Sequence, residues 1–314
     1  MLPIWYSPIY TDGLDPEARF PRARYREVRQ NLAPEVDAGS IEFFEPSALH
    51  PDLLHLAHDR EYCRAFLSGS LSVEAERRIG LRPWTSAIVQ RTLILTHGTV
   101  EATRRVMTTG GIAANLGGGT HHAYRDFGSG YCIFNDLAIA ARIAQRDHGA
   151  RHVLILDLDV HQGDGTAAIF ADDPSVETVS FHCGKNFPFR KTQSDHDEVF
   201  DEGTTDDLFL DRLTAFLTQR ATRELPDLIL FQAGVDALAT DRLGHLDLTR
   251  EGMQFRNQLV FEFARAWSIP LVITMGGGYG EPLETSVNAH ADLFRQAAQV
   301  QWSAGLPSPR VDSR

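Results

Sequence analysis

The feature that most constrains the fold is a regular alternation of short apolar segments and longer helix-like segments, which runs from residue 111 to the end of the chain. The apolar segments are rich in Val and Ile, as is typical of strands that are covered on both faces. Strands are predicted at about 111–116, 153–158, 176–182, 227–232 and 271–275, and helices at about 46–67, 85–108, 135–148, 205–222, 249–266 and 281–299. The alternation predicts an α/β protein with three α/β/α layers and an open, mainly parallel sheet.

The domain organisation is predicted to be simple. Residues 15–35 are rich in Arg and Pro and are expected to form a loop followed by a short helix. Two later helices carry start signals, Asn135 before one and Thr249 before the other. The most linker-like composition begins only at Gly305, so we predict a single domain over residues 1–304 and a loosely held tail over 305–314.

Charge and cysteine content limit the classes of partner and compartment. Lys and Arg total 30 and Asp and Glu total 42, a net charge of −12, so we expect no direct nucleic-acid binding. No apolar run has the length of a membrane span, and the first residues lack the pattern of a secretory signal. Cys63, Cys132 and Cys183 show no CxxC spacing and are expected to be reduced thiols, which favours a cytoplasmic protein.

Polar residues gather just after each predicted strand from residue 111 onward. They are Gly117–His122, Asp157–Gly165, Ser180–His182, Gln232–Asp236 and Gly276–Tyr279. The carboxyl ends of parallel strands share one edge of a sheet, which is where ligands bind in open α/β folds. Glycines beside these residues let the backbone approach closely. The sequence therefore predicts a functional site at this edge.

Asp159, His161 and Asp236 are the candidate metal ligands. Two carboxylates and one imidazole suit a divalent ion such as zinc and leave a coordination position for water. The alternatives are a helix-capping role for Asp159, a satisfied core histidine at His161 and an Asx turn at Asp236. The clustering of Asp159 and His161 with Asp164 favours the metal site.

His121 and His122 are candidates for proton transfer, because histidine titrates near neutral pH. Asp157 and Asp164 are the carboxylates available to orient them. Two histidines with different partners could divide the acid and base roles. The alternative is a solvated pair, since adjacent histidines are common in surface loops.

Three aromatic residues complete the candidate site. Tyr279 follows three glycines and could donate its hydroxyl to a developing oxyanion, or it could simply fill the loop. Tyr131 and Phe187 lie in loops near the same edge, where they could line an apolar entry or belong to the core. The two triple-glycine runs lack the residues of a phosphate-binding loop, so a nucleotide site is not favoured.

At this point the chain resembles the zinc-dependent histone deacetylase family of the arginase–deacetylase superfamily. The matching segments are Gly117–Ala123, Gly130–Asp136, Asp157–Gly165, Ser180–His182, Ala233–Asp236 and Gly276–Tyr279, in the family order over about residues 16–290. Further details are similar to the class IV branch, the histone deacetylase 11-like group with bacterial members. These are Arg19–Pro21, Ile79–Leu81 leading to Trp84, His161–Gly163 and Asn186–Pro188.

The resemblance implies the arginase–deacetylase fold and one catalytic Zn²⁺ held by Asp159, His161 and Asp236. It implies that His121 pairs with Asp157 and that His122, paired with Asp164, is the general base, while Tyr279 binds the substrate carbonyl. Gly130 would contact the acyl-lysine amide, and Tyr131 and Phe187 would flank the acyl channel.

The resemblance also implies a structural K⁺ near the zinc. Its oxygen ligands would come from Asp157, Asp159, His161, Ser180 and Phe181. The resemblance also allows a second monovalent site near Phe170 and Val176, but the sequence over 185–205 departs from the family pattern and does not define its ligands.

The predicted function is zinc-dependent removal of acyl groups, acetyl or longer, from lysine side chains of proteins or peptides. An alternative with the same chemistry is an acylpolyamine or other small-amide deacylase that acts on an acylated amine. An alternative of another class is a non-catalytic acyl-lysine-binding scaffold, which the presence of His121, His122 and Tyr279 disfavours. The pattern does not indicate an oligomeric state.

Overall fold

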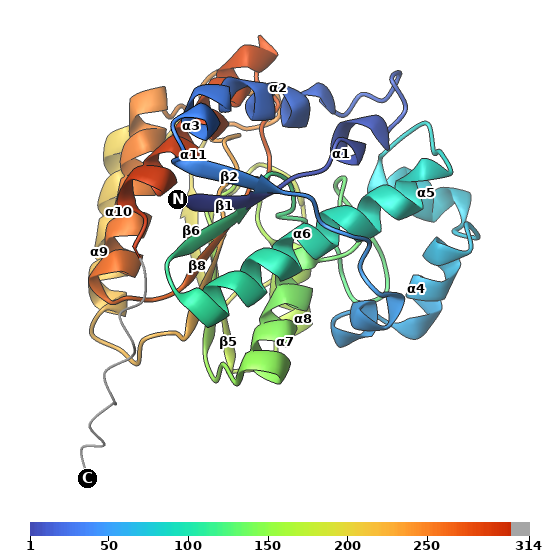
Figure 1. Ribbon diagram of the computed structural model, residues 1–314, viewed down its shortest axis with the longest axis horizontal. Coiled ribbons are helices and arrows are strands. Elements are labelled where there is room, and N and C mark those ends of the chain that lie inside the picture. Colours follow the sequence, from blue (N-terminus) through green and yellow to red (C-terminus); the bar gives the residue numbers. More distant parts are fainter. Residues whose placement is uncertain (303–314) are drawn as a thin grey trace.

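A computed structural model describes residues 1–302, whose strands form one eight-stranded sheet in which every neighbouring pair is parallel (Figure 1). The strands are β1 (Leu2–Trp5), β2 (Ile41–Phe44), β3 (Ile112–Asn115), β4 (Val153–Asp157), β5 (Val176–Cys183), β6 (His196–Phe200), β7 (Leu228–Gln232) and β8 (Leu271–Thr274). Their order is β2-β1-β3-β8-β7-β4-β5-β6. The predicted three-layer fold with an open parallel sheet is confirmed, whereas the predicted tail over 305–314 lies outside the described residues.

Helices cover both faces of the sheet. The elements are α1 (Ile9–Asp12), α2 (Ala23–Asn31), α3 (Ala33–Asp37), the 3₁₀-helix η1 (Pro51–Leu56), α4 (Arg60–Leu67), α5 (Val73–Ile79), α6 (Ala87–Thr109), α7 (Asp136–His148), α8 (Asp164–Phe170), α9 (Asp206–Arg220), α10 (Arg250–Ala266) and α11 (Leu283–Val300). α2, α11, α10 and α9 pack in sequence on one side, and α6, α7 and α8 on the other.

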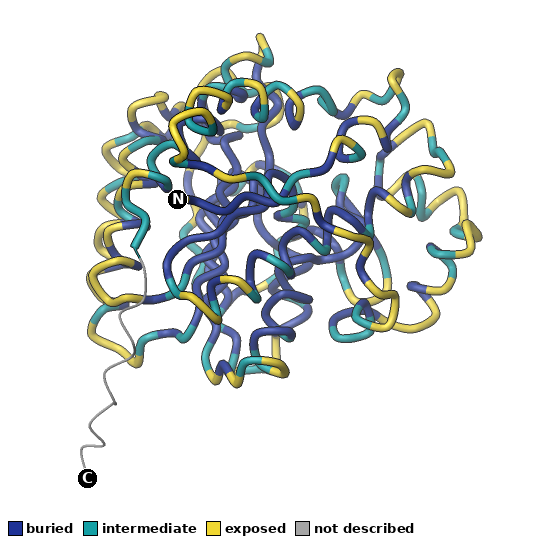
Figure 2. The backbone as a smooth tube through the Cα atoms, in the orientation of Figure 1, coloured by how far each residue is buried: buried dark blue, intermediate teal, exposed yellow. Residues whose placement is uncertain are grey.

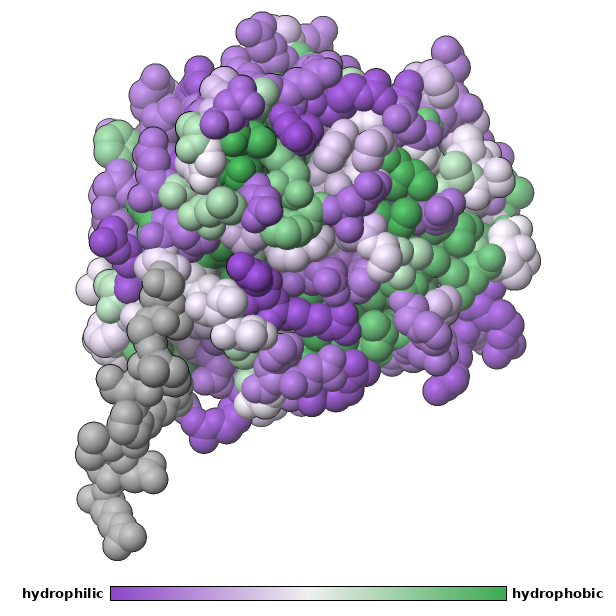
Figure 3. Space-filling model, in the orientation of Figure 1, coloured by the Kyte–Doolittle hydropathy of each residue, from purple (hydrophilic) through white to green (hydrophobic). Residues whose placement is uncertain are grey.

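The core lies along the central strands, which are dark blue in Figure 2. All residues of β3, β4, β7 and β8 are buried, as the continuous apolar runs predict for strands between two helical layers. Cys63, Cys132 and Cys183 are buried and not bridged. On the face drawn in Figure 3, polar and apolar residues are interspersed, with apolar ones gathering beside α4 and α6. No helix within residues 1–302 is long and apolar enough to cross a membrane.

Both predicted helix starts are present. The Asn135 side chain accepts a hydrogen bond of 2.9 Å from the Ala138 N–H, and the Thr249 side chain accepts one of 2.9 Å from the Gly252 N–H. These caps satisfy N–H groups that have no partner inside the helix. α7 therefore begins directly after the loop that carries Gly130 and Tyr131.

Two predicted elements differ from the structure, and several observed elements were not predicted. The helix expected over 46–67 is divided into η1 and α4, because Pro51 starts η1 and the chain turns before Arg60. The short helix expected within 15–35 is two helices, α2 and α3. The sequence did not indicate the strands β1, β2 and β6 or the helices α5 and α8. The strand β6 lies at an edge of the sheet and begins with polar residues, so it lacks the apolar run that marks the central strands.

The register of the sheet places the functional loops together. Asp157 at the end of β4 is aligned with Ser180 of β5 on one side and Gln232 of β7 on the other. Thr274, at the end of β8, is aligned with Gln232 and with Asn115 of β3. The loops that follow β3, β4, β7 and β8 therefore leave the sheet at one edge.

Candidate active site

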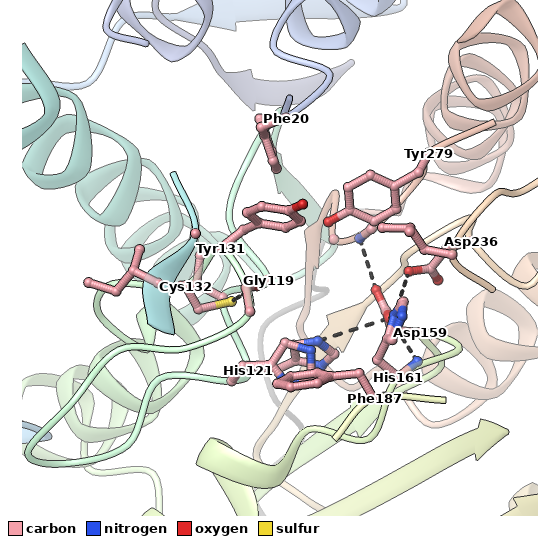
Figure 4. A pocket seen from close by; sticks show the side chains of 18 of the residues that line it. Phe20, Gly119, His121, Tyr131, Cys132, Asp159, His161, Phe187, Asp236 and Tyr279 are labelled. Carbon is pink, nitrogen blue, oxygen red and sulfur yellow. Dashed lines mark hydrogen bonds and ion pairs between the residues drawn. The ribbon is translucent and has the colours of Figure 1, made fainter. Parts of the chain in front are cut away.

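A cleft of about 890 Å³ opens at this edge of the sheet, within the usual size range of small-molecule sites. The predicted site residues that line it are His121, His122, Gly130, Tyr131, Asp159, His161, Phe187, Asp236 and Tyr279. Figure 4 shows side chains that converge on the cleft from separate loops, among them His121, Asp159, Asp236 and Tyr279. The structure thus brings together residues that are as much as 158 positions apart in the sequence, counted from His121 to Tyr279.

Asp159, His161 and Asp236 form a compact ligand set. Nδ1 of His161 lies 3.0 Å from Oδ1 of Asp159 and 3.0 Å from Oδ2 of Asp236. One potential ligand atom from each residue lies within 4.8 Å of the other two, and all three residues are buried. Two carboxylates and one imidazole can hold a zinc-type ion and leave a position open.

The surroundings of this triad fit a cation. A Cβ atom at Gly277 would lie 1.9 Å from Oδ2 of Asp236, and one at Gly234 would lie 2.1 Å from Oδ2 of Asp159, so glycine is needed at both positions. Burial, together with the neighbouring Asp159 carboxylate, raises the pKa of Asp236 to about 7. A divalent cation would compensate this concentration of buried negative charge.

The two histidines have separate carboxylate partners. Nδ1 of His121 lies 2.6 Å from Oδ2 of Asp157, and Nδ1 of His122 lies 2.6 Å from Oδ1 of Asp164. In each pair a ring N–H at Nδ1 donates to the carboxylate, which turns Nε2 away from it. The two rings lie 4.0 Å apart between centroids.

The pKa values of these histidines are shifted in opposite directions. Burial lowers the pKa of His121, but the Asp157 and Asp159 carboxylates outweigh it and raise the pKa to about 9. Burial and the positive charge of His121 lower the pKa of His122 to about 4, despite its bond to Asp164. At neutral pH the pair therefore combines a charged imidazole with a neutral one.

Tyr279 lies across the cleft from His121 in Figure 4. Its backbone N–H donates a hydrogen bond of 2.6 Å to Asp241, which fixes the start of its loop. Its ring packs 5.9 Å from the Tyr131 ring and 6.2 Å from the Phe20 ring. Burial raises the pKa of Tyr279 well above its ordinary value, so the hydroxyl remains a proton donor at neutral pH.

Gly130, Tyr131 and Phe187 lie at the predicted channel. Gly130 has φ +52°, and a Cβ atom there would lie 2.5 Å from Cδ2 of His122 and 3.0 Å from the Phe187 ring. Phe187 packs edge-on against His122, at 4.9 Å between centroids. Tyr131 and Phe187 are both partly exposed at the cleft, so neither is a core residue.

The residues expected to bind K⁺ also lie near one another. Asp157 and Ser180 are aligned across β4 and β5 and line the same small void. The Phe181 ring packs among Phe200, Phe209 and Phe216, so only its backbone oxygen is available as a ligand. Asp159 and His161 belong to the triad.

Sequence reasoning assigned no role to three polar residues that support the site. The side-chain amide of Gln232 donates a hydrogen bond of 2.8 Å to Oδ2 of Asp159. Arg24 donates to the carbonyl oxygens of Gly276 and Gly278 at 2.9 and 3.0 Å. Gln232 was visible as a polar strand end.

Arg256 is the third such residue. It lies beneath the ends of β4 and β7 and donates hydrogen bonds to backbone oxygens of both loops. Neither Arg24 nor Arg256 carried a signal, because each lies inside a helix far from any strand end.

The parallel sheet, the possible metal-binding triad and the two His–Asp pairs are typical of hydrolases of the arginase–deacetylase fold class. Sequence comparisons place the chain within that class. Residues 18–294 match the family model of the histone deacetylase domain. The chain therefore belongs to the histone deacetylase family, and by class it is a hydrolase of amide bonds, a deacetylase.

Three relatives illustrate the match. An uncharacterized protein of Picosynechococcus sp. is 41% identical over 298 residues, which cover 95% of this chain and 99% of that protein. Histone deacetylase 2 of Arabidopsis thaliana is 35% identical, over 64% of this chain and 52% of its own. The acetoin utilization protein AcuC of Bacillus subtilis is 32% identical, and the match covers 74% of this chain and 65% of AcuC. The match thus spans about half of the length of the Arabidopsis histone deacetylase and about two thirds of the length of AcuC.

Proposed function

We propose that the protein is a zinc-dependent deacylase that removes acyl groups, acetyl or longer, from lysine side chains. The observation that carries the proposal is the convergence of the Asp159–His161–Asp236 triad, the two His–Asp pairs and Tyr279 on one cleft. A zinc ion held by the triad would polarise the acyl carbonyl and acidify a water molecule.

His122 acts as the general base. Its low pKa keeps the ring neutral at neutral pH, and Asp164 holds the proton on Nδ1, so Nε2 is free to accept a proton from the attacking water. The amide C–N bond then breaks, and a histidinium proton passes to the departing lysine amine. The products are a carboxylic acid and a free lysine side chain.

His121 supplies positive charge beside the reacting carbonyl. Its raised pKa and its bond to Asp157 keep the ring protonated. Tyr279 faces the same space and donates its hydroxyl proton to the oxyanion that forms on the acyl oxygen. Because its ring is packed against Phe20 and Tyr131, little reorganisation is needed for that contact.

The substrate enters between Tyr131 and Phe187, and Gly130 contacts the acyl-lysine amide. This assignment is supported by the location of all three residues in the lining of the cleft. Asp157, Asp159, His161, Ser180 and Phe181 are proposed to hold a structural K⁺, which the closeness of Asp157 and Ser180 supports. The segments Arg19–Pro21, His161–Gly163 and Asn186–Pro188 favour placing the chain in the class IV branch.

A chelation series on one lysine peptide tests the proposal. Acyl chains from two to about fourteen carbons are offered to protein as purified, to protein treated with chelator, and to treated protein resupplied with zinc. We expect hydrolysis that chelation abolishes and zinc restores. Asp236→Asn is the matched variant that zinc should fail to restore, since it removes one ligand. Full activity after chelation would refute the metal mechanism.

Acetylspermidine is offered in parallel with the peptides. Faster hydrolysis of acetylspermidine than of any acyl-lysine peptide would favour the small-amine deacylase. A zinc-loaded protein that binds acyl-lysine but hydrolyses no amide would favour the binding scaffold.

A further inference from the structure

The opening of the cleft is basic although the chain is acidic overall, with a net charge of −12. Four exposed cationic side chains line the opening, those of Arg19, Arg78, Arg82 and Lys185. Glu17 is the one exposed carboxylate that lines it within residues 1–302. A charge of this sign at the entrance attracts anionic groups and repels cationic ones.

Two of these four cations already have partners. Nζ of Lys185 lies 2.8 Å from a carboxylate oxygen of Glu202. The Arg78 guanidinium lies 4.7 Å from the centre of the Phe127 ring. In contrast, neither Arg19 nor Arg82 has an ion-pair partner in the part of the chain that the structure describes. Their guanidinium groups are free to bind a carboxylate of the substrate.

Both unpaired arginines lie next to the walls of the acyl channel. Arg19 precedes Phe20, whose ring lies 5.3 Å from the Tyr131 ring. Arg82 lies two residues after Gly80. A Cβ atom at Gly80 would lie 3.3 Å from the Tyr131 ring. A substrate whose acyl group enters beside Tyr131 therefore presents its flanking residues to these two side chains.

On the basis of the function proposed above, we propose that this site selects acyl-lysines that are flanked by acidic residues, with Arg19 and Arg82 binding the flanking carboxylates. Phe189, which is 90% exposed at the same opening, offers an apolar surface to the peptide. The same charges disfavour acylated polyamines, whose remaining amines are cationic.

The test uses three acetyl-lysine peptides of equal length in which the flanking residues are Asp, Ser or Lys. Wild-type protein is expected to give the highest kcat/KM with Asp and the lowest with Lys. Each exposed charge contact is worth roughly two- to fivefold, so the difference between these two peptides should reach about tenfold. It should shrink at about 0.5 M salt because exposed charges are screened.

Arg19→Glu and Arg82→Glu should each reduce the preference for Asp, and the double variant should reverse it. Arg105→Glu is the matched control, because it makes the same charge change on an exposed residue near the end of α6, at the opposite edge of the sheet. The control is expected to keep the wild-type order. Equal kcat/KM values for all three peptides, or an equal response of Arg105→Glu and Arg82→Glu, would overturn the inference while the deacylase function stands.

Binding is measured separately by fluorescence anisotropy with the same labelled peptides. If no peptide is hydrolysed but the Asp peptide binds best and Arg19→Glu/Arg82→Glu abolishes that preference, the inference holds and the proposed catalytic function fails. If binding shows no dependence on the flanking charge, the inference fails.

Discussion

The guanidinium group of Arg256 donates a hydrogen bond of 2.6 Å to the carbonyl oxygen of Gly234, two residues before the metal-ligand candidate Asp236. The same group donates to Ala233 at 3.2 Å and to Leu158, which precedes Asp159, at 3.3 Å. Arg256 is fully buried and has no carboxylate partner within residues 1–302. Burial lowers the pKa of Arg256 to about 10, which still leaves it charged at neutral pH. α10 thus fixes the backbone of both ligand loops through one cation.

Arg256→Met is therefore expected to weaken metal binding by about ten- to a hundredfold, the usual effect of removing a group that orients metal ligands. The affinity is measured by competition with a chromophoric chelator, without reference to activity. Arg265→Met, an exposed arginine on the same helix, is the control. Unchanged zinc affinity in Arg256→Met would show that the loops hold their geometry without it.

Tyr279→Phe removes one donor to the oxyanion and leaves the ring packing intact. We expect kcat to fall by about two to three orders of magnitude, with a much smaller change in KM. Steady-state kinetics on an acetyl-lysine peptide measures both constants, and the melting temperature checks the fold. A near-normal kcat would remove Tyr279 from this role.

The two histidines are expected to differ in their effect on the rate. His122→Ala removes the neutral imidazole and should lower kcat/KM at pH 7 by about a hundredfold to ten-thousandfold. His121→Ala removes a charged imidazole and should have a smaller effect. The comparison is made by kcat/KM at one pH with zinc saturating. A larger loss in His121→Ala would reverse the assignment of the base.

Gly130→Ala is expected to lower activity, because the added methyl group would clash with the His122 ring. The added Cβ atom would lie 2.5 Å from Cδ2 of His122, and the residue also has φ +52°. Gly39→Ala is the matched control, since Gly39 has φ +71° but nothing within 4 Å of its Cβ position. Both variants lose about 1–2 kcal/mol through backbone strain, but only Gly130→Ala should lose activity. Equal activity in the two variants would show that His122 can move aside.

The residues that line the cleft were easier to recognise in the sequence than the edge strands of the sheet, for a physical reason. The residues after β4 and β7 are polar directly beside continuous apolar strands, so Asp159 and Asp236 were recognisable without knowledge of their contacts. β6 begins at His196 and continues with Asp197 and Glu198, so its pairing with β5 depends on backbone bonds rather than on an apolar pattern. Arg256 was equally invisible, because only the packing of α10 beneath the sheet brings it to its carbonyl partners.

His58 leads to a prediction about stability. Its Nδ1–H donates a hydrogen bond of 2.8 Å to the Tyr124 carbonyl oxygen, and its Nε2 accepts one of 2.9 Å from the Asn135 N–H at the start of α7. Burial lowers the pKa of His58 to about 4, so the folded protein resists protonation of this ring. The unfolded chain takes up that proton near pH 6.5.

The contribution of His58 is therefore complete above about pH 6.5 and is lost as the pH falls toward 4, because the unfolded state then binds more protons than the folded state. The loss amounts to about 3 kcal/mol over this range. Urea unfolding at a series of pH values measures it, and His58→Gln should be less stable at pH 7 but show a flatter dependence between pH 6.5 and 4. His50→Gln, which changes an exposed histidine, should keep the wild-type slope. If His58→Gln retains that slope as well, the acid sensitivity of the fold arises from other groups.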